Sequence, residues 1–180
     1  MRKYVTLARD VEVSEIPAGT RVSLPASTPL TVVQALGGSY TAMTMQGYMV
    51  RIEGKDADAI GEEPPPPPPT PEEAAKKSTV DLAWDQLRTC YDPEIPVNIV
   101  DLGLVYECAV TPSENGASKA TVRFTLTAPG CGMGDFLRQD VIAKLLAVPG
   151  IKDVDAQVVF DPPWDQSRMS DAARLQLGMM

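Results

Sequence analysis

The sequence contains no histidine among its 180 residues. This absence excludes Ser-His and Cys-His nucleophile pairs and zinc sites that need imidazole, and it removes the side chain best suited to proton transfer near neutral pH. The three cysteines, Cys90, Cys108 and Cys131, form no C-x-x-C pair and are too widely spaced for a disulfide framework. Because the sequence shows no catalytic constellation, we expect that the protein is not an enzyme. The odd number and wide spacing of its cysteines suit a reducing compartment.

Long apolar runs and basic clusters are absent as well. No stretch reaches the roughly 20 apolar residues that a membrane-spanning helix needs, and the first residues lead into a mixed stretch instead of the apolar region of a signal peptide. The 16 Lys and Arg residues against 24 Asp and Glu residues give a net charge of −8, which disfavours a phosphate-backbone partner. We therefore expect a cytoplasmic protein with no membrane partner and no nucleic-acid partner.

The chain divides into three parts by composition. Residues 1–61 contain six short runs of strand-forming residues separated by Pro- and Gly-rich turns, which predicts a small all-β barrel or roll. The six runs are residues 4–7, 11–15, 21–24, 30–34, 40–45 and 48–52. Residues 62–77 include six consecutive prolines, and such a run holds an extended polyproline II conformation. We therefore predict a Pro-rich linker between the β domain and a second domain at residues 78–180.

The predicted second domain has the element order α-β-β-α-β followed by a short helix, which places the chain in the α+β class. Its first helix is expected to begin at Ser78 or Thr79 and its last at Ser170, because hydroxyl residues are favoured N-caps. Apolar and alternating runs predict its strands. These are residues 104–110, 120–126 and 154–160.

Cys131 lies between the second of these strands and the next helix. Apolar residues recur at three- and four-residue spacings from Phe136 to Leu146, so the sulfur is expected at or just before a helix N-terminus. Free backbone N–H groups and the helix dipole favour a thiolate there, and the flanking Gly130 and Gly132 leave room for a ligand or a partner. The alternative is a buried cysteine that acts as a small hydrophobic residue in a Gly-rich turn.

Four motifs follow one another in residues 79–180. They are Asp92-Pro93-Glu94-Ile95, Val100-Asp101-Leu102-Gly103-Leu104-Val105-Tyr106, Thr127-Ala128-Pro129-Gly130-Cys131 and Asp161-Pro162-Pro163-Trp164. Together they resemble the iron–sulfur cluster assembly domain family, which includes the PaaD proteins of the phenylacetate pathway. The N-terminal part is similar to the extra domain of SufT proteins. This similarity rests on Leu36-Gly37-Gly38-Ser39-Tyr40 and Gly47-Tyr48-Met49-Val50-Arg51-Ile52.

The resemblance implies an accessory role in the maturation of iron–sulfur proteins, with the assembly machinery and client apo-proteins as partners. Within the family, the cysteine of the strand-to-helix turn is the residue most often tied to function, and it corresponds to Cys131. The aspartate of the first motif corresponds to Asp92, and the threonine of the third motif corresponds to Thr127.

Thiolate is a ligand suited to iron–sulfur clusters, but one cysteine cannot hold a cluster in the usual four-cysteine manner. Iron or a cluster at Cys131 would need Cys90, a carboxylate such as Asp92, an external thiol, or a second chain in a homodimer. Cys90 could instead be a core residue at a helix end, and Asp92 could cap a turn. Cys108 lies on an apolar strand face, so we expect it to be structural.

Two other functions stay open from the sequence. One is a thiol-dependent redox or sulfur-transfer enzyme with Cys131 as the nucleophile, which would depend on the helix dipole for activation because no imidazole is present. The other is an adaptor without metal, which binds client proteins through the turn and its glycine rim.

Overall fold

The computed structural model describes residues 3–64, 70–92, 95–113, 116–129 and 132–179. The chain forms two compact units, Met1–Pro67 and Pro68–Met180. In the described residues, six strands and a 3₁₀ helix make up the first unit, and three strands with several helices make up the second. The fold thus belongs to the mixed α+β class that the sequence predicts.

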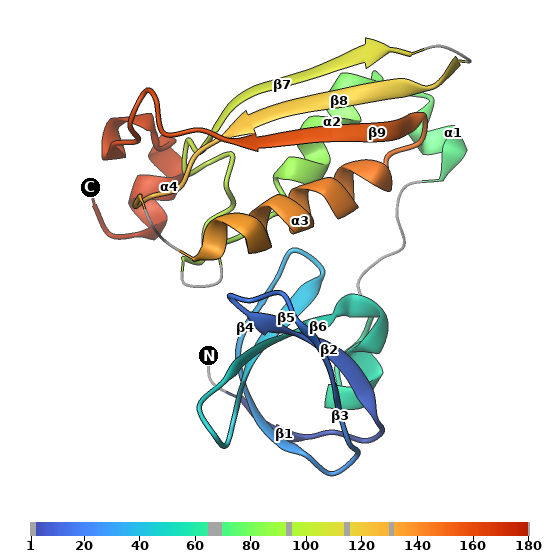
Figure 1. Ribbon diagram of the computed structural model, residues 1–180, viewed down its shortest axis with the longest axis vertical. Helices are drawn as coiled ribbons and strands as arrows, with labels where there is room; N and C mark the ends of the chain where they lie inside the picture. Colours follow the sequence, from blue (N-terminus) through green and yellow to red (C-terminus); the bar gives the residue numbers. More distant parts are fainter. Residues whose placement is uncertain (1–2, 65–69, 93–94, 114–115, 130–131, 180) are drawn as a thin grey trace. The chain divides into compact units, whose positions relative to one another are not determined.

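The first unit is built on one antiparallel sheet with the strand order β1-β4-β5-β6-β2-β3. Figure 1 shows this sheet strongly curled. Its strands are β1 (Lys3–Thr6), β2 (Val11–Ile16), β3 (Arg21–Leu24), β4 (Pro29–Leu36), β5 (Ser39–Thr44) and β6 (Met49–Glu53). Side chains alternate between the two faces, so that Val11 and Val13 are buried while Glu12 is exposed. The buried face forms a core around Leu30 and Ile52.

A 3₁₀ helix, η1 (Gly54–Ile60), follows β6 and differs from the all-strand expectation for residues 1–61. Its residues Ala57, Ala59 and Ile60 are buried, and the helix contacts β1, β5 and β6. A segment of seven residues is too short to repeat an apolar pattern, so periodicity does not reveal it.

The second unit packs helices on a sheet with the strand order β7-β8-β9. Strands β7 and β8 are antiparallel, whereas β8 and β9 are parallel and are connected through α3. Helices α2 and α3 contact each other, and Figure 1 shows both of them on the same face of the sheet. The elements are α1 (Pro71–Ala74), α2 (Thr79–Leu87), β7 (Val105–Pro112), β8 (Ser118–Phe124), α3 (Met133–Leu146), β9 (Ile151–Val158), η3 (Gln166–Arg168) and α4 (Asp171–Gln176).

Strand β8 supplies the centre of the second core. Ala120, Val122 and Phe124 are fully buried, whereas Arg123 between them is exposed. The alternation of apolar and polar residues along β8 therefore corresponds to a strand with one face covered by helices and the other face in solvent.

Helix α3 covers this core with part of its predicted apolar stripe. Val141 and Leu145 are completely buried, but Leu146 is 47% exposed. Leu146 adjoins Leu145 in sequence, and neighbouring residues of a helix do not share a face. The buried stripe is therefore narrower than the sequence predicts.

Helices α2 and α4 of the second unit begin at hydroxyl caps. The Ser78 hydroxyl accepts a hydrogen bond of 3.1 Å from the Asp81 amide at the start of α2. The Ser170 hydroxyl accepts one of 3.1 Å from the Ala173 amide at the start of α4. Both residues satisfy amides that have no partner within the helix, as their N-cap preference predicts.

Part of the range predicted as linker contributes to the second unit. The short helix α1 lies within residues 62–77, and its last residue, Ala74, is only 6% exposed and belongs to the second core. The Pro- and Glu-rich composition around Ala74 gives no apolar pattern that could announce this burial.

Candidate functional site

The candidate site lies where strand β8 leads into helix α3. The helix begins at Met133 and its N-cap is Gly132, which is exposed and has no side chain to bond the first amides. Cys131 and Gly130 lie outside the described residues. Asp135 is exposed in the first turn of the helix, where its charge complements the dipole but opposes a nearby thiolate.

The turn before the helix has buried residues at both ends, and the residues described between them are exposed or half-buried. Leu126 and Met133 are buried, whereas Ala128 and Pro129 are exposed and Thr127 is half-buried. The backbone at residues 128–129 and 132 is thus accessible to a partner.

Close packing ties the strand end to the helix start. A Cβ atom added to Gly134 would lie 3.1 Å from Cδ1 of Leu126, tighter than most real contacts. A side chain at this position would require the Leu126 side chain to shift by a few tenths of an ångström. Gly134 therefore serves the packing of the turn.

Three backbone hydrogen bonds connect the loop after α2 to this turn. The Ile99 amide donates to the Cys90 carbonyl at 2.9 Å, and the Leu104 amide donates to the Ile99 carbonyl at 2.9 Å. The Thr125 amide then donates to the Leu104 carbonyl at 2.8 Å. The loop that begins beside Asp92 and the turn that contains Thr127 therefore belong to one hydrogen-bonded backbone network.

Cys90 has the surroundings of a core residue. It is completely buried, shares a core cluster with Leu126, and its sulfur lies 3.8 Å from the Gln86 carbonyl oxygen. A thiol in this position is inaccessible to an external ligand in the folded state. The metal role that the sequence left open for Cys90 stays a prediction.

Asp92 is a carboxylate with little access to solvent. Only 9% of the residue is exposed, and its carbonyl accepts a 3.2 Å hydrogen bond from the Ile95 amide. Carboxylates are rarely buried unless they are paired or hydrogen-bonded. This burial distinguishes Asp92 among the described carboxylates of the loop after α2, and its backbone also takes part in the loop geometry.

Asn98 organises the same loop, and the sequence reading did not single it out. Its side-chain oxygen accepts hydrogen bonds from the amides of Val100 at 3.0 Å and Asp101 at 2.9 Å, and its amide nitrogen donates to an Asp101 carboxylate oxygen at 2.6 Å. Asn bonding to its own backbone two residues on is a known turn signal, and its place in a Pro- and Asp-rich loop could have revealed it. Asp101 is a turn residue here.

Cys108 is half-buried on β7, opposite Val122 on the core side of the sheet. Burial raises the pKa of its thiol to about 11. The thiol therefore stays protonated at neutral pH and is a poor nucleophile and ligand. This environment agrees with a structural role.

The described residues do not form a complete metal site by themselves. In the part of the chain that the structure describes, no three His, Cys, Asp or Glu residues gather into a group that could hold a metal ion. The fit of Cys131 to iron therefore depends on ligands beyond the described set.

Within the described ranges, no helix has both the length and the apolar content needed to cross a membrane.

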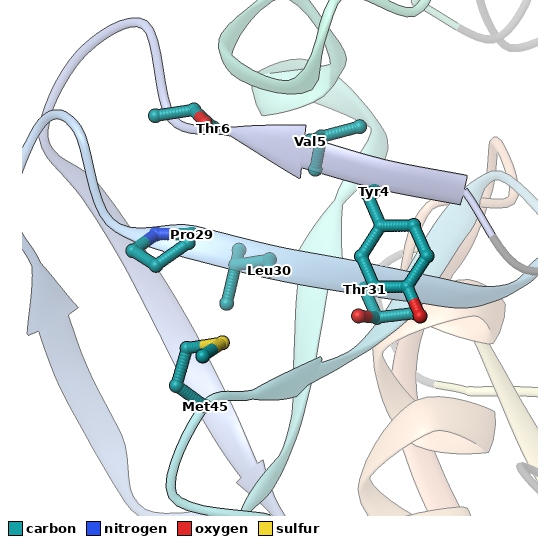
Figure 2. Close-up of a pocket in the computed structure, with 7 residues that line it drawn as sticks. All are labelled: Tyr4, Val5, Thr6, Pro29, Leu30, Thr31 and Met45. Carbon is teal, nitrogen blue, oxygen red and sulfur yellow. The ribbon is translucent and has the colours of Figure 1, made fainter.

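A pocket in the first unit offers no comparable chemistry. Figure 2 shows its side chains coming from β1, from β4 and from the turn after β5. They are Tyr4, Val5, Thr6, Pro29, Leu30, Thr31 and Met45. None of them is a thiol or a carboxylate, the groups that the sequence makes available for iron in the second unit.

Comparisons with known proteins locate the similarity in the second unit. A family model described as iron–sulfur cluster assembly protein matches residues 82–158. The chain is 47% identical over 95 residues to an Fe-S protein maturation auxiliary factor of Porphyromonas gingivalis, a match that covers 52% of this chain and 86% of that protein. It is 40% identical over 88 residues to the Fe-S protein maturation auxiliary factor SufT of Staphylococcus aureus, covering 49% of this chain and 96% of that protein.

A crystal structure of a domain of unknown function from Bacillus anthracis is also similar. It has 38% sequence identity and a TM-score of 0.48, and the match covers 57% of this chain and 93% of that chain.

The first unit has no counterpart in the matched Staphylococcus aureus relative. The 88 matched residues cover 96% of that relative, so the relative is too short to contain a separate β domain as well. The resemblance of residues 1–61 to an extra domain of SufT proteins therefore stays a prediction.

Proposed function

The chain belongs to the iron–sulfur cluster assembly protein family, and we propose that it is an auxiliary factor in the maturation of iron–sulfur proteins that acts through Cys131. The observation that carries the proposal is the 47% identity to a maturation auxiliary factor over nearly the whole of that relative. Its partners are then iron–sulfur assembly proteins and client apo-proteins, and its compartment is the cytoplasm.

The cargo is iron or an iron–sulfur cluster held transiently at the turn. Cys131 precedes the N-cap of α3 in the chain, a position where free helix amides favour a thiolate, and thiolate is the ligand type that clusters prefer. Gly130 and Gly132 beside it carry no side chain that would obstruct a protein partner. The resemblance also points to Thr127 and Asp92, which follow in sequence the two ends of the hydrogen-bonded network, Thr125 and Cys90.

The remaining ligands come from outside the described residues in this proposal. Cys108 is unsuited because its pKa is raised to about 11, and Cys90 is completely buried. A donor protein, a client protein, an external thiol or a second copy of the chain would complete the coordination. Shared coordination of this kind suits a protein that passes its cargo on, because release then requires only the exchange of partner ligands.

The test is a comparison of Cys131→Ser with Cys108→Ser in cells that depend on this protein for an iron–sulfur enzyme. We expect Cys131→Ser to fold normally and to abolish maturation, because Ser is nearly isosteric but is a poor cluster ligand. Cys108→Ser should keep the activity of the folded fraction. Anaerobic iron and sulfide analysis of both proteins then reports whether the thiolate carries the cargo.

The same experiment separates the alternatives. Full maturation activity of Cys131→Ser would reject the proposed role of this sulfur and favour an adaptor that works without metal. Thiol turnover without bound iron or sulfide would favour a redox or sulfur-transfer enzyme.

A further inference from the structure

The C-terminal segment, residues 161–176, is hydrogen-bonded to the loop that precedes β7 and to β7 itself. The indole N–H of Trp164 donates to the carbonyl of Leu102 at 2.8 Å. The hydroxyl of Tyr106 donates to the carbonyl of Pro162 at 2.8 Å. These bonds link residues 62 and 56 positions apart in the sequence, so only the tertiary fold creates them.

Two further bonds extend this contact to both sides. The Ser170 amide donates to the carbonyl of Asp101 at 2.9 Å. The Gln176 side chain donates to the carbonyl of Pro96 at 2.6 Å. The C-terminal segment thus donates hydrogen bonds to carbonyl groups on both sides of the Asn98 turn. We expect these bonds to restrict the movement of that turn.

The closest approach occurs between Gly103 and the backbone of Arg168. A Cβ atom on Gly103 would lie 2.2 Å from the Arg168 carbonyl oxygen, and Gly103 has a φ of +72°. Both observations require glycine here. The segment lies beyond residues 82–158, the part that the family model matches.

We propose that the C-terminal segment is a positioning element for the candidate site, an inference that rests on the proposed function. It holds the carbonyls of Asp101 and Leu102 and packs on Gly103. These contacts fix the turn at residues 98–103. Ile99 and Leu104, at the two ends of this turn, form the hydrogen bonds that connect the backbone of Cys90 to that of Thr125. The segment contacts no cargo in this role, and it acts by keeping the Asp92 loop and the Thr127 turn in register.

The test is Trp164→Phe, which keeps an aromatic ring and removes the indole donor. Trp84→Phe is the matched control, because Trp84 packs on the same core and its indole donates no hydrogen bond to any described residue. Hydrogen exchange is measured at the amides of Ile99, Leu104 and Thr125, together with global unfolding by denaturant. We expect about tenfold faster exchange at these amides in Trp164→Phe, beyond any change in the control.

Maturation activity is measured on the same two variants at equal amounts of folded protein. Faster local exchange with reduced activity in Trp164→Phe alone would support the positioning role. Exchange that changes only in step with global stability, or faster exchange with full activity, would overturn it. Failure of the proposed function is recognised separately, as full activity of Cys131→Ser.

Discussion

The Thr125 amide donates a 2.8 Å hydrogen bond to the Leu104 carbonyl, joining the chain just after β8 to the residue just before β7. Leu104 is in turn bonded to Ile99, and Ile99 to Cys90. The turn that leads to Cys131 and the loop that follows Cys90 are thereby held in one network. We therefore expect a substitution that displaces the backbone of one segment to displace the backbone of the other.

Alkylation should distinguish the three cysteines in the native protein. Cys90 is completely buried, and Cys108, with a pKa of about 11, is only about one-thousandth thiolate at pH 8. Cys131 should therefore react first with iodoacetamide, as peptide mass spectrometry of timed samples would show. Equal protection of all three thiols would indicate that Cys131 is a structural residue in its turn.

Cys108→Ser should destabilise the second unit by about 1–3 kcal/mol, because it places a hydroxyl against the apolar core. The raised pKa adds a pH dependence. Folding favours the protonated thiol, so the stability that Cys108 contributes is present below its ordinary pKa of 9.0 and is lost as pH rises toward about 11. The difference in unfolding free energy between wild type and variant should therefore narrow over this range in denaturant titrations. A constant difference would show that the thiol does not titrate as described.

Gly103→Ala should be far more damaging than Gly116→Ala. Both glycines have a positive φ, +72° and +74°, so both substitutions carry roughly 1–2 kcal/mol of backbone strain. Only Gly103 meets the Arg168 backbone, whereas a Cβ at Gly116 would have nothing within 4 Å. The clash with Arg168 adds to this strain, so Gly103→Ala should lower the free energy of unfolding by roughly 2–5 kcal/mol, measured by chemical denaturation. Similar losses in the two variants would argue against the close approach.

A fragment of residues 70–180 should fold by itself and be more stable than one of residues 79–180. The shorter fragment lacks Ala74, which is 6% exposed in the second core, and burying its methyl group is worth about 0.8 kcal/mol. The control is Ala74→Asp in the longer fragment, which should remove the advantage. If the two fragments have the same unfolding midpoint and slope, α1 is not part of the folded unit.

The sequence by itself predicted the α+β class, and its four motifs revealed the family that the comparisons confirm. Strand β8 shows why the elements were readable, since Val122 and Phe124 alternate with the exposed Arg123 over neighbouring residues. Ser78 and Ser170 likewise mark helix starts through bonds that span three residues. Such features depend on contacts within one or two turns of chain, so the local order of residues is enough to determine them.

Only the tertiary structure decided the burial of Cys90, the inclusion of Ala74 in the second core and the contact of Gly103 with Arg168. The sequence left Cys90 open between a metal ligand and a core residue, because a cysteine at a helix end fits either role. It predicted a turn at Gly103 but not what packs on it. Burial and close approach depend on which distant segments meet when the whole unit packs, and no spacing within a single element contains that information.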